Sequence, residues 1–378
     1  MDNLGIYIHI PFCKSRCNYC SFLSSIYNPE IEDKYFDSLK KEIILFSNSI
    51  NKSDYVVDTI YIGGGTPSIC KADNIKQIVD LIKEKFRLSL KEFTIECNPN
   101  SITKEKLEIY KAMGINRISI GVQSLKDKSL KAIGRAHDRL TVIEKVDLVN
   151  SFGFEISCDL MVGLPFQEKE DIKDYIDTFS KKVEHISTYM LSLEDGTCLK
   201  EMVDKKEIEI PDDDKTVDLM EYATNYLEEK GYIRYEISNF ARKNHEAKHN
   251  MGYWEGKDYI GFGPSAHSLI KNTRFYNIND IDKYMENIEK TSDSSFYILE
   301  GKLTEKDIKN ERIMLSLRTK KGLDLLDFKR QFSMDFLVIY KDKILQNKDY
   351  LIIEDGYIKI KPQYFNVMNS IIVDFLDM

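Results

Sequence analysis

The sequence predicts an α/β protein built on a parallel β-sheet, with a smaller module toward its C-terminal end. The first observation is a repeated helix–glycine–strand pattern, which occurs at 113–120, 152–158 and 230–238. The second is that six or seven such units fall within roughly the first 240 residues, which is the spacing of βα repeats in barrel proteins. We therefore expect a partial or complete barrel of β/α units rather than a short open sheet.

Apolar periodicity locates the individual elements. Apolar, β-branched runs predict strands, and apolar residues spaced three and four apart predict helices. We expect strands at 4–10, 56–62, 93–96, 115–120, 154–158, 185–193 and 232–238. We expect helices at 33–46, 73–86 and 103–113, the last of which has Gly114 as its C-cap.

A different pattern toward the C-terminus predicts a second module. Helical spacing at 280–290 and 302–317 precedes a hairpin at 351–360, where Asp355-Gly356 supplies the positive φ angles of a type I′ turn. Helices followed by a hairpin are typical of a small α+β, winged-helix-like module, for which we expect a lid or docking role. The predicted domains are a barrel at 1–240, a linking segment at 241–290 and a C-terminal domain at 291–378.

Composition narrows the class of protein. The 378 residues are 42% hydrophobic and 31% charged, which is ordinary for a globular chain. No apolar run approaches the roughly 20 residues that span a bilayer, and the N-terminus does not read as a signal peptide. Seven cysteines, an odd number and partly clustered, indicate free thiols and a reducing, cytoplasmic location. A net charge of −8 without a basic cluster argues against nucleic-acid binding.

Three of the cysteines, Cys13, Cys17 and Cys20, form a C-x3-C-x2-C motif directly after the first predicted strand. Thiolates select Zn, Cu(I) or an iron–sulfur cluster. A structural zinc site needs four ligands and usually a second cysteine pair, which the sequence lacks. Three thiolates suit a four-iron cluster with one iron left open for another ligand. The motif therefore predicts a [4Fe–4S] cluster.

Polar residues also follow other predicted strands, at the end where barrel proteins carry their function. They are Gly63 to Thr66, Glu96, Gln123 and Asp159. Taken singly, each has a structural alternative: the glycines a tight turn, Glu96 a satisfied carboxylate, Asp159 a helix N-cap. Arg135, in the segment after Gln123, has the alternative of a solvated helix charge. Their common position at one mouth of the barrel favours a shared site.

The cysteine motif, with Tyr7 two residues before His9 and Pro-Phe before Cys13, resembles the radical S-adenosylmethionine (SAM) superfamily. Within it, nearly the whole chain is similar to the oxygen-independent coproporphyrinogen III oxidase group. The resemblance implies a partial (β/α)6 barrel and one-electron cleavage of SAM to a 5′-deoxyadenosyl radical at the cluster. By motif match, the residues that hold SAM are Tyr7, Gly64, Gly65, Thr66, Glu96, Gln123, Arg135 and Asp159.

A second motif lies far downstream, His249-Asn250-Met-Gly-Tyr253-Trp254, and contains the sole tryptophan of the chain. A histidine with aromatic neighbours offers an axial iron ligand beside a flat apolar surface, as haem requires. The alternative is a structural aromatic cluster around a hydrogen-bonded histidine. H-N-x-x-Y-W resembles the motif of a branch of the group that carries haem as a chaperone. His267 is a further possible polar contact at the mouth.

Two departures decide between the branches of the group. Phe22 stands where the oxidase has a fourth cysteine, and only twelve residues precede Cys13, where the oxidase has an extension. Both favour a haem chaperone that delivers haem to apoproteins such as respiratory haem proteins. This function implies an electron donor for the cluster and at most transient membrane association. The alternatives are oxidative decarboxylation of coproporphyrinogen III and, against the acidic charge balance, radical modification of RNA.

Overall fold

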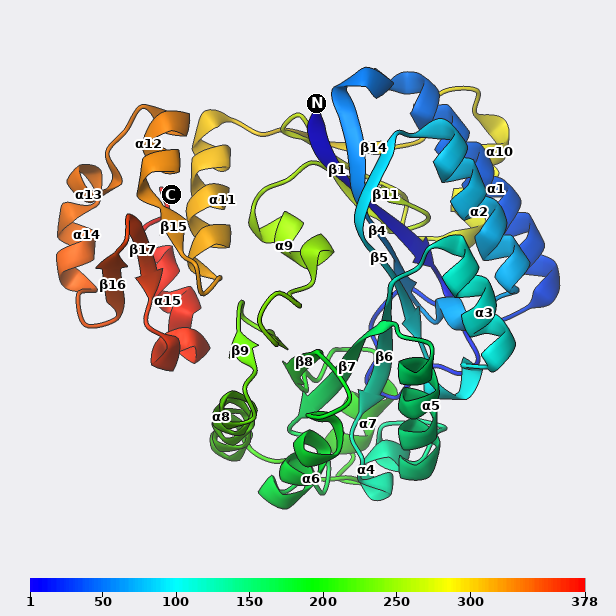
Figure 1. Ribbon diagram of the computed structural model, residues 1–378, viewed down its shortest axis with the longest axis horizontal. Coiled ribbons are helices and arrows are strands. Elements are labelled where there is room, and N and C mark those ends of the chain that lie inside the picture. The colour runs from blue at the N-terminus through cyan, green and yellow to red at the C-terminus, as the bar shows by residue number, and fades with distance from the viewer. Residues whose placement is uncertain (378) are drawn as a thin grey trace.

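A computed structural model describes residues 1–377 and shows a partial α/β barrel with a smaller module beside it (Figure 1). Six strands run parallel in sequence order, as the family resemblance implies for a partial (β/α)6 barrel. They are β1 (Asp2–Ile10), β4 (Tyr55–Gly64), β5 (Leu88–Cys97), β6 (Arg117–Gln123), β7 (Glu155–Val162) and β8 (His185–Met190). The connecting helices are α1 (Pro29–Ser49), α2 (Ala72–Lys85), α3 (Lys104–Met113), α4 (Asp127–Ala132), α5 (Arg139–Ser151) and α6 (Lys169–Phe179). The predicted fold class is confirmed.

Shorter strands extend both edges of this sheet. β11 (Tyr259–Phe262) pairs parallel with β1, and an antiparallel series follows it. That series is β12 (His267–Ile270), β13 (Thr273–Tyr276) and β14 (Ile298–Lys302). At the other edge, β8 is followed by α7 (Cys198–Asp204), α8 (Asp213–Glu229) and the antiparallel pair β9 (Ile233–Arg234) and β10 (Asn239–Ala241). Among the described residues, the strands of this sheet therefore run from β14 to β9 without closing into a ring.

The prediction that residues 232–238 form a further parallel strand is wrong. The chain reverses after β9, where the Tyr235 amide donates to the Asn239 carbonyl and the Ser238 amide donates to the Glu236 carboxylate. This local turn competes with continued strand pairing, because Glu236 satisfies a backbone donor that a longer strand would give to the sheet. The strand expected at 185–193 is also shorter, since β8 ends at Met190.

The six parallel strands alternate between an apolar outer face and a polar inner face. On β6, Ile118 and Ile120 are fully buried in the main core, whereas Arg117 and Ser119 line a recess on the other face. The outward side chains pack against the surrounding helices, and burial of each large one contributes about 1.5–3 kcal/mol. The polar interior contrasts with the closely packed apolar centre of most complete barrels. The structure therefore leaves room for a ligand inside the sheet.

The C-terminal module has an apolar core of its own, centred on Phe328, Phe336 and Phe375. Its helices are α11 (Glu305–Leu317), α12 (Leu325–Phe332), α13 (Phe336–Ile339), α14 (Lys341–Gln346) and α15 (Met368–Val373). Its strands are β15 (Leu323–Asp324), β16 (Leu351–Glu354) and β17 (Tyr357–Ile360). The predicted hairpin is confirmed, because Asp355 and Gly356 join β16 to β17 with φ angles of 52° and 83°.

Two further helices bear on the site. α10 (Ile281–Lys290) packs on α1 at the outer side of the sheet, where the expected helix at 280–290 lies. α9 (Lys248–Trp254) lies on the opposite side, between the sheet and the C-terminal module, and contacts β4, β5 and α11 (Figure 1). Among the described residues, no helix is long and apolar enough to cross a membrane.

Candidate functional site

The three motif cysteines lie on the loop that leaves β1, and none of them forms a disulfide. Short strands β2 (Phe12–Cys13) and β3 (Ser25–Ile26) pair at the base of this loop. Its middle is fixed from outside, because the Asn18 amide donates to the Ile133 carbonyl and the Leu199 amide donates to the Asn18 carbonyl. The thiols are half-buried and the loop that carries them is held by backbone hydrogen bonds.

Two polar side chains contact these sulfurs. The Thr66 hydroxyl lies 3.6 Å from Cys13 Sγ, and Arg135 Nη1 lies 3.4 Å from Cys17 Sγ. A guanidinium and a hydroxyl stabilise thiolates, which are the form of cysteine that binds metal. Within residues 1–377, no three histidine, cysteine, aspartate or glutamate side chains lie close enough together to hold a single metal ion. Three thiolates on one loop are the ligand set of a four-iron cluster, in which each thiolate would bind a different iron.

The glycine-rich turn after β4 packs closely against the cluster loop. Gly64 has φ of 113°, and a Cβ there would lie 2.7 Å from the His9 ring. The Gly65 amide donates to the Ile10 carbonyl, and a Cβ on Gly65 would lie 2.7 Å from the Phe12 carbonyl oxygen. Glycine is therefore required at both positions by close approach, not only by the turn.

His9 and Tyr7 support this turn from β1. His9 Nε2 donates to the Leu23 carbonyl at 3.2 Å, so the neutral ring accepts the Tyr7 hydroxyl at Nδ1, at 3.0 Å. Because Leu23 lies on the cluster loop, His9 buttresses that loop. Tyr7 in turn stacks on Tyr61 of β4, with 6.2 Å between ring centroids.

Glu96 links the glycine turn to the barrel interior. Its carboxylate accepts the Gly64 amide at 3.1 Å and the Tyr61 hydroxyl at 2.6 Å. Burial raises the pKa of Glu96, while the two hydrogen bonds lower it. A carboxylate with these partners retains acceptor capacity for a ligand hydroxyl or ammonium group.

Asp159, Gln123 and Arg135 converge beside Glu96. Burial and the nearby Glu96 carboxylate raise the pKa of Asp159 to about 7, against the opposing effect of Arg135 and of hydrogen bonds from Ser187 and Gln123. Gln123 Oε1 and Arg135 Nε are buried and have no hydrogen-bond partner within the described chain. Gln123 also has φ of 71°, an unusual conformation that functional sites often contain.

These findings decide between the structural alternatives for two residues. Asp159 lies inside β7, so the alternative of a helix N-cap is wrong. Arg135 contacts Cys17 Sγ and the Gly121 carbonyl, so the alternative of a solvated helix charge is wrong. The unpaired donor and acceptor in this group fit the polar and charged groups of SAM.

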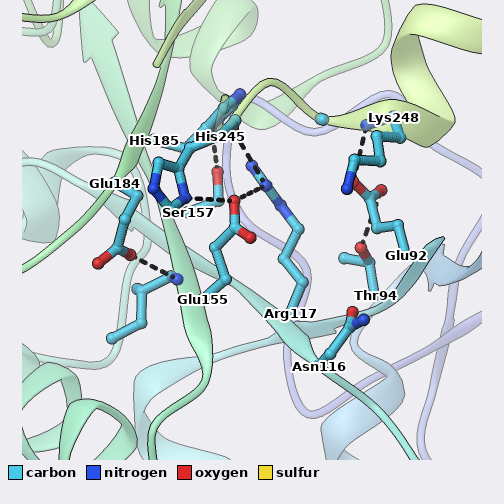
Figure 2. A network of polar contacts seen from close by, with 12 residues as sticks. Glu92, Thr94, Asn116, Arg117, Glu155, Ser157, Glu184, His185, His245 and Lys248 are labelled. Atoms are coloured by element: carbon cyan, nitrogen blue, oxygen red, sulfur yellow. Dashed lines mark hydrogen bonds and ion pairs between the residues drawn. The ribbon is translucent and has the colours of Figure 1, made fainter. Parts of the chain in front are cut away.

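Below the mouth, the inner face continues into an open recess with an enclosed volume of about 60 Å³. The polar side chains that line it come mainly from β5 to β8 and include Thr94, Arg117, Ser119, Ser157, His185 and Ser187. Figure 2 shows part of this network, in which Ser157 bonds to His185 at 2.6 Å and Arg117 to Glu155 at 2.7 Å. These residues were not predicted from the sequence. The available signal was polar residues at every second position of a strand, as in Arg117-x-Ser119 and Ser157-x-Asp159.

The histidine of the downstream motif is buried on α9. His249 Nδ1 lies 3.0 Å from the Thr59 hydroxyl, and Nε2 lies 2.9 Å from the Tyr253 hydroxyl. Its ring also stacks on Tyr61 with a centroid distance of 5.3 Å. Burial and the nearby Lys257 lower the pKa of His249 to about 3, so the ring is neutral. In this conformation both ring nitrogens have hydrogen-bond partners.

The remaining members of the motif lie on both sides of His249. Tyr253 and His249 line a tight crevice with an enclosed volume of about 0 Å³, whereas Asn250 lines the recess of the barrel. Trp254 ends α9 and is half-buried. His267 is not brought to this group; it is exposed on β12 and stacks on Tyr276.

The fold and the cluster loop define a radical SAM protein. Residues 7–179 match the Radical SAM superfamily, and residues 303–363 match the HemN C-terminal domain. The heme chaperone HemW of Lactococcus lactis is 33% identical over 98% of this chain and 96% of its own length. The heme chaperone HemW of Bacillus subtilis is 35% identical over 86% of each chain. The chain belongs to the HemW family.

The fold also matches a solved structure. The coproporphyrinogen III oxidase HemN of Escherichia coli superposes with a TM-score of 0.84, over 99% of this chain and 90% of that one. The two sequences are 21% identical, so this match concerns the fold. It includes the barrel together with the C-terminal module.

Proposed function

We propose that the protein is a haem chaperone, which binds haem next to a SAM-bearing [4Fe–4S] cluster and delivers it to apoproteins. The family membership supports the chaperone class. The observation that carries the proposal is the position of the H-N-x-x-Y-W motif: His249 stacks on Tyr61, whose hydroxyl bonds to Glu96. The motif for the cargo thus lies one side chain away from the proposed SAM site.

The cluster would be held by Cys13, Cys17 and Cys20. SAM would be held by Tyr7, Gly64, Gly65, Thr66, Glu96, Gln123, Arg135 and Asp159. When bound, the two groups supply one-electron cleavage of the sulfonium of SAM. The chain contributes a fixed loop, a paired carboxylate at Glu96 and a guanidinium beside the thiolates, all at a partly enclosed mouth where charge interactions are strong.

Haem would be bound by His249 with Tyr253 and Trp254 beside it. For His249 to ligate iron, one ring nitrogen must give up its hydrogen bond, to Tyr253 or to Thr59. The neutral state of the ring favours this exchange, because only neutral imidazole binds iron. Uptake of haem is then a local rearrangement of α9 rather than binding to a preformed open ligand.

The proposed partners follow from this function. They are haem, client apoproteins such as respiratory haem proteins, and a reductant that supplies electrons to the cluster. Seven cysteines without a disulfide among them fit a reducing, cytoplasmic compartment. Delivery to a membrane-bound client would involve at most transient membrane association.

Titration of the iron-loaded protein with haemin tests the haem site. We expect a Soret band in the wild type that weakens in His249→Ala and stays unchanged in His267→Ala, where the substituted histidine is exposed and stacks on Tyr276. A wild-type protein that gives no Soret band, or a His249→Ala variant with the wild-type spectrum, would contradict the assignment.

The alternative is a radical enzyme that decarboxylates coproporphyrinogen III. The observation in its favour is the polar recess beside Glu96 and Asp159, which would hold one side chain of the porphyrinogen near bound SAM. Anaerobic incubation with SAM, a reductant and coproporphyrinogen III distinguishes the two functions. The chaperone predicts no protoporphyrinogen, and its formation would overturn the proposal.

A further inference from the structure

The larger recess connects the proposed SAM site to the haem motif. Tyr61 and Glu96 line its upper part, and Ala247 and Asn250, from the start of α9, line its side. Its enclosed volume of about 60 Å³ is well below that of small-molecule pockets, so it admits part of a large ligand rather than a whole macrocycle. A substituent that extends from a porphyrin edge has that size.

Arg117 lies at the deep end of this recess with one unused donor group. The residue is 3% exposed, and its Nη1 donates to Glu155 at 2.7 Å and to the His245 carbonyl at 3.3 Å (Figure 2). Its Nη2 is buried and has no hydrogen-bond partner among residues 1–377. Buried donors are rarely left unpaired, because each costs about 1–3 kcal/mol. A guanidinium with a free Nη2 suits an anionic oxygen, and a carboxylate above all.

The charges along the recess also favour binding of an anion at the Arg117 end. Near the mouth, Glu96 and Asp159 would repel a carboxylate. Ser119 pairs in register with Glu96, and Arg117 precedes it by two residues, which places Arg117 about 7 Å deeper along the strands. Burial and the nearby Arg117 lower the pKa of His185, which also lines the recess, so that side chain is neutral. Arg117 is the one lysine or arginine among the described residues that line the recess. Its Nη1 is paired with Glu155, so the unpaired Nη2 is the cationic donor that a carboxylate meets there.

We propose that Arg117 anchors a carboxylate of the cargo, of the propionate type that haem carries, at the deep end of the recess. This inference rests on the proposed haem carriage and adds a residue outside the H-N-x-x-Y-W motif. The anchored carboxylate holds one edge of the porphyrin beside Asn250, and this fixes the orientation in which the macrocycle meets α9.

Esterification of the ligand tests the anchor without changing the protein. Haemin and haemin dimethyl ester are titrated separately into the wild-type protein, and the titration is repeated with iron-free protoporphyrin IX and its dimethyl ester. The iron-free pair separates the anchor from axial ligation. We expect each ester to bind at least about tenfold more weakly than its acid, because a charge-assisted hydrogen bond is lost.

The protein variants complete the test. The affinity of Arg117→Gln for haemin should fall to that for the dimethyl ester. Its affinity for the ester should equal that of the wild type. Glu155→Gln is the matched control: it removes the ion-pair partner of Arg117, leaves the guanidinium in place and should not weaken haemin binding. If Arg117→Gln does not fold, the comparison of acid and ester in the wild type still decides.

The outcomes separate this inference from the function on which it rests. Equal affinities of acid and ester in the wild type overturn the anchor and leave haem carriage intact. A weakening of SAM binding in Arg117→Gln without any effect on haemin assigns the anchored carboxylate to SAM and also overturns it. Failure of both porphyrin pairs to bind the wild type overturns the anchor together with the haem function.

Discussion

Tyr61 stands between Glu96 and His249 and contacts both. Its hydroxyl donates to Glu96 Oε1 at 2.6 Å, and its ring lies nearly parallel to the His249 imidazole, 24° between planes. Glu96 also accepts the Gly64 amide, so one side chain joins the glycine turn at the cluster loop to the helix of the downstream motif. Two motifs far apart in the sequence are thus in direct contact through a single phenol.

Tyr61→Phe separates the two contacts of this phenol. The ring stack on His249 remains possible, but Glu96 loses its hydroxyl donor. A hydrogen bond to a charged group contributes about 1.5–3 kcal/mol, so we expect SAM affinity to fall by about tenfold or more while haemin binding changes little. Equilibrium dialysis with SAM measures this. Tyr55→Phe, whose hydroxyl bonds to Asp258 and not to Glu96, is the control for SAM binding; equal losses of SAM affinity in both variants would contradict the account.

Tyr253→Phe tests whether His249 must be released to bind haem. The variant keeps the aromatic ring and removes the hydroxyl that occupies His249 Nε2. Loss of a competing hydrogen bond of about 1 kcal/mol should tighten haemin binding by about fivefold. A Soret titration gives the affinity. Weaker binding would instead indicate that the Tyr253 hydroxyl itself supports the haem.

Buried Glu42 should make stability fall as pH rises. On α1 it accepts the Gly263 amide and hydrogen bonds from Asn277 and Tyr284, and burial raises its pKa to about 7 from 4.5. Between these two values the unfolded chain releases a proton that the folded chain retains. This group therefore lowers the free energy of unfolding by about 3 kcal/mol as pH rises from 4.5 to 7.

The measurement is urea unfolding of the wild type and Glu42→Gln at several pH values across this window. Glu42→Gln is less stable at low pH, because an amide nitrogen faces donors, but it should lose this part of the pH dependence. Asp159, whose pKa is also raised to about 7, adds to the slope in both proteins. Identical slopes would show that Glu42 does not titrate in this range.

Gly64→Ala and Gly256→Ala separate backbone strain from close packing. Both glycines have positive φ, of 113° and 69°, but a Cβ at Gly64 would lie 2.7 Å from the His9 ring, whereas at Gly256 no described atom lies within 4 Å. We expect Gly256→Ala to lower the free energy of unfolding by about 1 kcal/mol. Gly64→Ala should lower it by about 3 kcal/mol and should also abolish SAM binding. Urea unfolding and SAM dialysis test both; equal costs would show that His9 yields to a Cβ.

Much of the fold could be predicted because its signals are local. Apolar spacing located β1, β4 and the helices α1 to α3, and Gly114 ends α3 with φ of 92° as expected. The prediction of a parallel strand at 232–238 was wrong because Glu236 holds a turn there, and apolar periodicity gives no signal of such a turn. Strands β11 to β14 were not predicted, since they are short and gain their stability from pairing with distant strands.

Part of the candidate site could likewise be predicted from the sequence, and part could not. The polar residues at strand ends were recognisable because the ends of parallel strands share one mouth. Arg117 and His185 lie at the beginnings of their strands, so a search for polar residues at strand ends did not find them. Only the register of β5 to β8 shows that they line one recess with Glu96 and Asp159. The hydrogen bonds of His249 to Thr59 and Tyr253 likewise depend on how α9 packs against β4.

The central claim is that one chain carries a cysteine-bound cluster and, separately, a haem. The most direct measurement is the anaerobic absorption spectrum, with iron and haem content, of the protein reconstituted with iron, sulfide and haemin. We predict cluster absorption and a Soret band in the wild type. Loss of cluster absorption alone is expected in the Cys13→Ala, Cys17→Ala, Cys20→Ala triple variant, and loss of the Soret band alone in His249→Ala. A wild type that lacks either chromophore would contradict the account.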